Sequence, residues 1–195
     1  TGLELIDSIL PKYTNIPDLI LCPGWSHDSE VGAVMSAKAE NINGMFEAMV
    51  LLDVDTRPET GVAHYSEVPN WKKERNLTKA NELVCFPKLK LGERTFHLST
   101  QLAGLIAKTD NDSDLGKGTP RESASNKALQ ADSMVLADGT EVLLDVQQAN
   151  FLNDNGIITA LNFYNGFVSW GDWTACFPGS TDPVEYYYCV SRMFK

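Results

Sequence analysis

The segment covering residues 18–53 decides the fold: an apolar run, Asp18-Leu-Ile-Leu-Cys22, is followed by a helical pattern over residues 29–43 and a second run, Glu47-Ala-Met-Val-Leu-Leu-Asp53. Short apolar runs bounded by proline and glycine are typical of buried strands. Between the two runs, apolar residues recur near the 3.6-residue period of a helix, and Asp28 is the expected N-cap. This order predicts a β-α-β unit with a parallel strand pair and a right-handed crossover.

The rest of the chain continues to alternate strands with helices. Further strand signals occupy residues 83–86, 88–91, 94–98, 135–136, 141–144, 157–163 and 167–170, and helical patterns occupy residues 66–76, a stretch capped by Ser99, and residues 146–152. Gly92-Glu93 is a two-residue hairpin turn, and residues 110–124 form a loop. We therefore expect an α/β fold with a mixed, mainly parallel sheet flanked by helices and with inserted hairpins.

Both ends of the chain carry structural signals. Residues 3–10 form an amphipathic stretch, which Pro11 is expected to stop. Residues 186–190, Tyr-Tyr-Tyr-Cys-Val, indicate a strand. Because Thr1 leads directly into the first pattern and the last one ends near Lys195, we expect the chain to be a fragment of a larger protein.

Composition excludes several classes of protein. The chain has 195 residues with 16 basic and 26 acidic side chains, a formal net charge of −10. Nucleic-acid binders normally carry the opposite sign, and no run of 18 apolar residues is present, so we expect neither a nucleic acid nor a membrane as a partner. Four cysteines lie among apolar neighbours without metal spacing, which predicts reduced, buried side chains in an intracellular protein: Cys22, Cys85, Cys176 and Cys189.

Serine hydrolase chemistry has one candidate, Ser26-His27-Asp28, on a loop after the first strand. Adjacent residues cannot align as a triad, and no G-x-S-x-G motif occurs. In the favoured interpretation, Asp28 caps a helix and His27 is a polar loop residue. The alternative is a hydrolase with its site at Ser26 and His27. His64 and His97 each stand alone and are expected to be structural. We therefore expect no catalytic residues.

The sequence signals for ion and cofactor sites are equally weak. Residues 110–116 resemble the start of a calcium-binding EF-hand loop, but the sixth and twelfth positions are Leu115 and Arg121 instead of glycine and glutamate. In Gly116-Lys117-Gly118-Thr119, the second glycine interrupts the order that a phosphate loop requires. No histidine pair has metal spacing. We expect no metal site and no cofactor.

The last third of the chain is rich in aromatic residues. They are Phe163, Tyr164, Phe167, Trp170, Trp173, Phe177 and Tyr186 to Tyr188. Most are expected to pack in the core and the sheet, and some could form an interface.

Eight stretches carry a resemblance to a known family. They are residues 21–28 (LCPGWSHD), 37–44 (AKAENING), 96–104 (FHLSTQLAG), 125–127 (SNK), 137–142 (ADGTEV), 148–153 (QANFLN), 156–162 (GIITALN) and 190–194 (VSRMF). Together and in this order they resemble the contractile phage tail sheath protein family, which extends to contractile bacteriocin-like particles. The likeness is scattered over nearly the whole chain.

The resemblance implies a structural protein without enzymatic activity. Sheath subunits have a subtilisin-like α/β domain without a working triad, stack helically around a tail tube, and rearrange on contraction. Residues 1–182 would be that domain and residues 183–195 the start of a C-terminal sheath domain. The implied partners are other sheath subunits and the tail tube protein, in a virion tail assembled in the bacterial host cytoplasm. We expect the isolated chain to be monomeric, because the terminal arms that link neighbouring subunits are absent from it.

Overall fold

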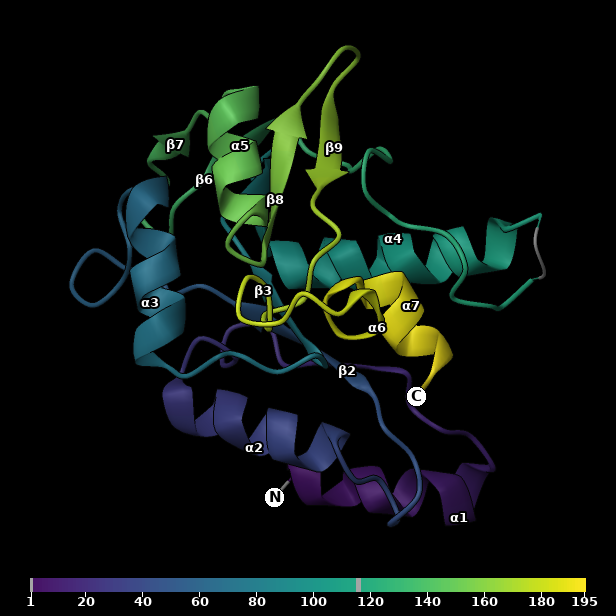
Figure 1. Ribbon diagram of the computed structural model, residues 1–195. Helices are drawn as coiled ribbons and strands as arrows, with labels where there is room; N and C mark the ends of the chain where they lie inside the picture. Colours follow the sequence, from purple (N-terminus) through teal and green to yellow (C-terminus); the bar gives the residue numbers. More distant parts are fainter. Residues whose placement is uncertain (1, 115–116) are drawn as a thin grey trace.

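The computed structural model describes residues 2–114 and 117–195, and Figure 1 shows how they are arranged. A five-stranded sheet has the order β1-β2-β3-β8-β9. Its strands are β1 (Leu19–Leu21), β2 (Met49–Asp53), β3 (Glu82–Cys85), β8 (Ile157–Asn162) and β9 (Phe167–Trp170). The first four are parallel to one another, and β9 runs antiparallel to β8. The β-α-β unit predicted for residues 18–53 is confirmed as a parallel pair of β1 and β2.

A second sheet of four strands has the order β5-β4-β6-β7. Its strands are β4 (Lys88–Leu91), β5 (Arg94–His97), β6 (Ser133–Val135) and β7 (Glu141–Val142). All its described pairs are antiparallel, including the predicted hairpin of β4 and β5, where Gly92 has a φ of +57°. The α/β class with mixed sheets and flanking helices is confirmed. The expectation of a mainly parallel sheet is not, because the inserted hairpins form this separate antiparallel sheet.

The two faces of the large sheet carry separate apolar cores. On one face, Val50 and Leu52 of β2 pack with Met35 and Ala39 of α2 (Ser29–Ala39). On the other face, Met49 and Leu51 pack with apolar side chains of α4 (Leu98–Asp112). Because alternate residues of a strand point to opposite faces, the continuous apolar run of β2 predicts burial on both sides. All five residues of β2 are buried.

Shorter helices complete the molecule. They are η1 (Gly2–Ser8), α1 (Ile9–Tyr13), η2 (Tyr65–Glu67), α3 (Val68–Glu74), α5 (Val146–Asn153), α6 (Pro183–Tyr186) and α7 (Tyr188–Met193). The predicted cap of α2 is confirmed, because Asp28 accepts hydrogen bonds from the backbone N–H groups of Glu30 and Val31. That helix ends at Ala39 rather than near residue 43, since Ile42 forms a β-bridge with Phe46.

Three local predictions are wrong. Pro11 does not stop the first helical stretch, because it lies in the first turn of α1, where a backbone N–H has no intrahelical partner. The N-cap of α4 is His97 rather than Ser99, and the helix continues to Asp112 into the expected loop. Residues 188–193 form α7 instead of a strand, and only Tyr187 makes an isolated bridge, with Trp173.

The outer edge of β9 is covered by residues 126–129. Ser169 accepts a hydrogen bond from Asn126 N and donates one to Lys127 O, and Leu129 N donates to Phe167 O. β9 therefore has backbone partners on both sides, although the covering segment is not a named strand.

The free state of the cysteines agrees with the prediction from their spacing. All four cysteines are free; Cys85, Cys176 and Cys189 are buried and Cys22 is half-buried. Within the described residues, no helix is both long and apolar enough to cross a membrane.

Candidate functional site

Asp53 is a buried carboxylate at the carboxyl end of β2, and two serines converge on it. Ser26 Oγ donates to Asp53 Oδ2 at 3.0 Å and accepts from Asp53 N at 3.1 Å. Ser99 Oγ donates to the same carboxylate at 2.7 Å, and Ser99 N donates to Oδ1 at 3.1 Å. His97 Nδ1 lies 3.3 Å from Oδ2 without hydrogen-bonding geometry.

Three elements bring these residues together. Ser26 lies on the loop after β1, Asp53 ends β2, and Ser99 is in the first turn of α4. The carboxyl ends of parallel strands meet at one edge of a sheet, which explains the first two positions. Sequence reasoning found Ser26, named Ser99 only as a helix cap and gave Asp53 no role; an aspartate closing a predicted buried strand was the available signal.

This cluster is not arranged for serine hydrolysis. A nucleophilic serine needs a general base on its hydroxyl, and the acid must orient that base. Here both serines donate directly to the acid. The carboxylate also accepts the Ser99 backbone N–H at the start of α4, so it serves as a cap that ties β1, β2 and α4 together.

The other two histidines do not join this cluster. His27, paired with Ser26 in the sequence hypothesis, is half-buried in the cleft described next. His64 caps η2, with its Nδ1 2.8 Å from Ser66 Oγ and its backbone N–H bonded to Glu67. Its role is local, as expected for a structural histidine.

A cleft of about 430 Å³ opens beside the Asp53 cluster, and we call it the edge cleft. Its lining comes from residues 24, 25, 27 and 28, from segment 54–57, and from Lys88, His97 and Ala137. Asp55 and Arg57 form a bidentate pair in it, at 3.0 and 2.9 Å. Burial raises the pKa of Asp55, but hydrogen bonds from Arg57 and Thr60 outweigh it and bring the pKa down to about 2. Burial, and then the charge of Arg57, lower the pKa of His27.

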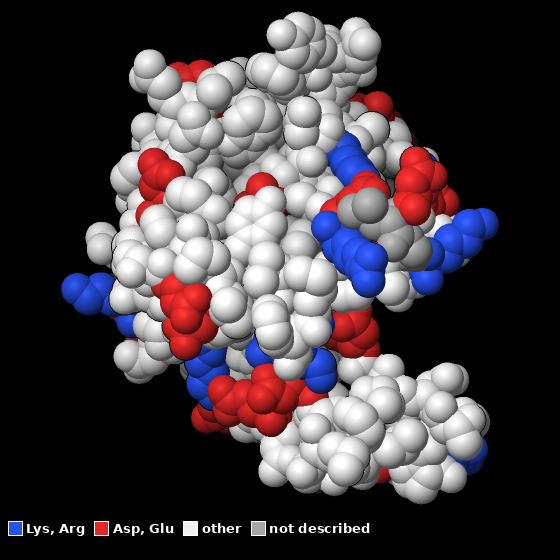
Figure 2. All heavy atoms as spheres, turned by 45° about the vertical axis from the view of Figure 1, so that its right-hand side comes forward, with Lys and Arg blue, Asp and Glu red and all other residues white. Residues whose placement is uncertain are grey.

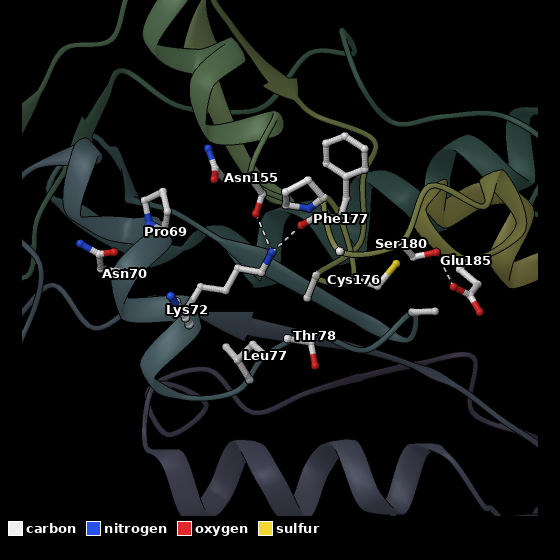
Figure 3. A pocket seen from close by; sticks show the side chains of 15 residues that line it. Pro69, Asn70, Lys72, Leu77, Thr78, Asn155, Cys176, Phe177, Ser180 and Glu185 are labelled. Carbon is white, nitrogen blue, oxygen red and sulfur yellow. Dashed lines mark hydrogen bonds between the residues drawn. The ribbon is translucent and has the colours of Figure 1, made fainter.

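A larger cavity, about 790 Å³, lies between α3 and the 175–180 segment, and we call it the lysine pocket (Figure 3). Lys72 of α3 extends along it, and its Nζ donates to the carbonyls of Asn155 at 2.5 Å and Phe177 at 2.8 Å. Burial lowers the pKa of Lys72 to about 8. Since the ammonium is held by two backbone carbonyls, Lys72 joins three segments of the chain.

Of the nine aromatic residues in the last third of the chain, only Phe167 and Tyr188 are buried, so the expectation that most of them pack in the core is not met. Trp173, Phe177 and Tyr186 pack against one another beside the lysine pocket, and Tyr188 is buried. Tyr164, at the tip of the β8–β9 hairpin, is 91% exposed.

The ion-site candidates gain no support. Among the described residues, no group of three or more histidine, cysteine or acidic side chains could hold a metal ion. Asp110 of the calcium-like stretch pairs with Arg192, while Leu115 and Gly116, which both loop hypotheses need, lie outside the described residues.

Comparison with solved structures places the fold. A chain of an extracellular contractile injection system (PVC) sheath complex in the contracted state matches with a TM-score of 0.66 and 20% identity, over 98% of this chain. A chain of the helical sheath of the anti-feeding prophage (AFP), also in the contracted state, matches with a TM-score of 0.65 and 20% identity, over 99% of this chain. A chain of the AFP baseplate matches with a TM-score of 0.64 and 19% identity, over 98% of this chain. The resemblance found in the sequence is thus confirmed at the level of the fold.

These matches concern part of each larger chain. This chain spans about half the length of the chains that it matches, 46% to 48%. No protein-family model and no curated protein matches the sequence.

Proposed function

We propose that this chain is part of a structural subunit of a contractile sheath, which assembles helically around a tail tube and rearranges on contraction. The observation that carries the proposal is the fold, which nearly the whole chain shares with chains of two contracted sheaths. The eight sequence stretches that resemble the tail sheath family support it independently.

The surface supports a role based on contacts. The lowest lobe of the molecule, formed by η1 and α1, is largely uncharged on the face in Figure 2. Exposed apolar side chains lie on it and next to it: Leu5, Tyr13, Ile16 and Met45, of which Met45 is 78% exposed. A helical filament requires head-to-tail contacts between different surfaces of each copy, and apolar side chains are suited to such contacts.

The interior supports movement as one rigid body. Both faces of β2 are buried, and Arg192 of α7 is hydrogen-bonded to Asp110 of α4 and to Asp18 before β1. Contraction then needs only two packings of whole subunits that differ in free energy, with a barrier between them.

Further parts of the proposal follow from the family resemblance. Residues 1–182 form the subtilisin-like domain and residues 183–195 begin the C-terminal sheath domain. The partners are other sheath subunits and the tube protein, in a tail assembled in the host cytoplasm. The subunit acts without catalysis or a cofactor, which agrees with the direct bonds from Ser26 and Ser99 to Asp53.

Immunogold electron microscopy tests the proposal. Antibodies against this chain are applied to particles from cells that encode it. Labelling along the full length of striated tubes is the expected result. Labelling confined to unassembled material, or to one end of the tubes, would reject a sheath role.

The isolated chain tests the expected lack of self-association. Multi-angle light scattering at micromolar concentration should give the mass of a monomer, 21.5 kDa. A discrete stable oligomer would contradict this part of the proposal.

A further inference from the structure

The edge cleft lies where α/β proteins commonly bind small molecules. It opens at the carboxyl ends of β1 and β2, and Lys88 of β4 and Ala137 bring the second sheet to its other side. Its volume of about 430 Å³ falls in the range of small-molecule sites. The proposed sheath function makes no use of this cleft.

The acidic groups of the cleft are already occupied. Asp28 accepts two backbone N–H groups as the cap of α2. Asp55 accepts hydrogen bonds from the backbone and side chain of Arg57 and from Thr60. Asp53, behind the cleft, is bonded to Ser26 and Ser99. These carboxylates have little accepting capacity left for a ligand donor.

The polar groups of the edge cleft that have no partner are mostly hydrogen-bond donors. Thr56 is 4% exposed, and its Oγ1 has no hydrogen-bond partner. Within residues 2–114 and 117–195, neither Lys88 Nζ nor the ring of His27 makes a hydrogen bond or ion pair. Arg57 uses Nε and Nη2 on Asp55 and keeps Nη1. A buried hydroxyl without a partner is uncommon and calls for an explanation such as a bound water or ligand.

We propose that the edge cleft binds a small tetrahedral oxyanion, a phosphate ion or a phosphate monoester. The available donors come from four separate positions, Thr56, Arg57, Lys88 and His27. A tetrahedral phosphate presents oxygens in more directions than a planar carboxylate and carries more negative charge for Arg57 and Lys88. Hydrogen bonds between charged groups are also stronger than neutral ones.

Isothermal titration calorimetry with inorganic phosphate, at fixed ionic strength and pH 7, tests this site on the 195-residue chain. We expect saturable binding of one phosphate with a Kd on the order of 1 mM. Glycerol 3-phosphate should bind as well, and acetate, which has a single charge and two oxygens, should bind more weakly. Absence of saturable phosphate binding, or acetate binding equally well, would overturn the proposal.

The chain offers a matched pair of variants. Lys88 and Lys90 are both half-buried lysines of β4, but only Lys88 lines the cleft. Lys88→Gln should weaken phosphate binding about tenfold, the effect of losing one charged hydrogen bond, and Lys90→Gln should leave it within about twofold. Equal losses in the two variants would mean a general charge effect and would overturn the site.

Thr56 provides a second, uncharged test. Thr56→Val should weaken phosphate binding, and Thr56→Ser, which keeps the hydroxyl, should restore it. If Thr56→Val binds phosphate as well as the unaltered chain, its hydroxyl is bonded to water instead and the proposed donor set is wrong. Circular dichroism and Tm of each variant establish that the chain is folded.

The His27 ring gives an independent readout by NMR. The charged and titratable groups that act on His27 are Arg57, Asp55, His97 and Asp28, and its pKa is lowered in the free protein, chiefly by burial. A bound anion favours the charged imidazolium, so saturating phosphate should raise this pKa. His64, outside the cleft, should not respond. Equal responses of His27 and His64 would overturn the assignment.

Discussion

Arg192, on the last helix, donates a 2.6 Å hydrogen bond from Nη2 to Asp110 Oδ2 in the last turn of α4. The same guanidinium bonds Asp18, which precedes β1. Arg192 is buried, and although burial lowers its pKa, its bonds to the two carboxylates outweigh this and raise the pKa above the ordinary value. Arg192 therefore stays charged in the interior and connects three elements.

Removing one member of a buried ion cluster should be costly. Arg192→Leu leaves Asp110 without its partner and should lower the free energy of unfolding by about 3 kcal/mol. Urea denaturation measures the change. The control is Lys79→Gln, which breaks the exposed pair with Glu40 and should cost less than about 1 kcal/mol. Equal costs would show that the Arg192 cluster contributes no more than a surface pair.

Asp53 should contribute to stability through the serines that converge on it. Asp53→Ala leaves both hydroxyls and the Ser99 N–H without their acceptor, and should cost about 3 kcal/mol. Asp138→Ala is the matched control, because Asp138 also bonds a backbone N–H and a hydroxyl, both of Thr140, but on the surface. That control should cost less than about 1 kcal/mol in the same urea experiment. A small effect of Asp53→Ala would contradict the capping role.

Ser26 should be unreactive. Its hydroxyl donates to a carboxylate and is buried, so an activated-serine probe such as a fluorophosphonate should not label the chain. Mass spectrometry after incubation with the probe checks this. Labelling that disappears in Ser26→Ala would revive the hydrolase alternative.

Lys72 should make stability depend on pH in the alkaline range. Its pKa falls from 10.5 to about 8 on folding, so between these values the unfolded chain binds more protons. The free energy of unfolding therefore rises as the pH increases from about 8 to 10.5, and this gain disappears when the pH is lowered to about 8. The gain attributable to Lys72 is on the order of 3 kcal/mol.

Urea denaturation from pH 7.5 to 10.5 isolates this effect by comparison with Lys72→Met. The stability of the unaltered chain should increase relative to Lys72→Met as pH rises. Lys73→Met, a change at the exposed neighbouring lysine, should follow the unaltered chain. Parallel curves for all three proteins would mean that Lys72 is not protonated differently in the folded state.

Local patterns sufficed for much of the fold. The continuous apolar run of β2 and the cap at Asp28 were recognisable because each depends on neighbours in sequence. The strand prediction for residues 186–190 was wrong because it relied on the preference of aromatic residues for strands. In the folded chain, Tyr188, Cys189 and Arg192 are buried on one side of α7, a spacing that fits a helix.

The candidate sites were much less accessible to sequence reasoning. Ser26 was singled out, but its partner Asp53 is 27 residues away and Ser99 is 46 residues beyond that. The edge cleft is lined by the loops after β1 and β2 and by residues of the second sheet, and the separation of the hairpins into a second sheet was not predicted. Such convergence depends on long-range packing, which local pattern does not encode.

The segment of residues 126–129 along β9, here called the strip, affects how the protein should be handled. Residues 126–129 cover the outer hydrogen-bonding edge of this uncharged strand. If the strip detached, the bare edge would be a template for strand-by-strand aggregation. Conditions that loosen this short segment should therefore cause precipitation before the cores melt.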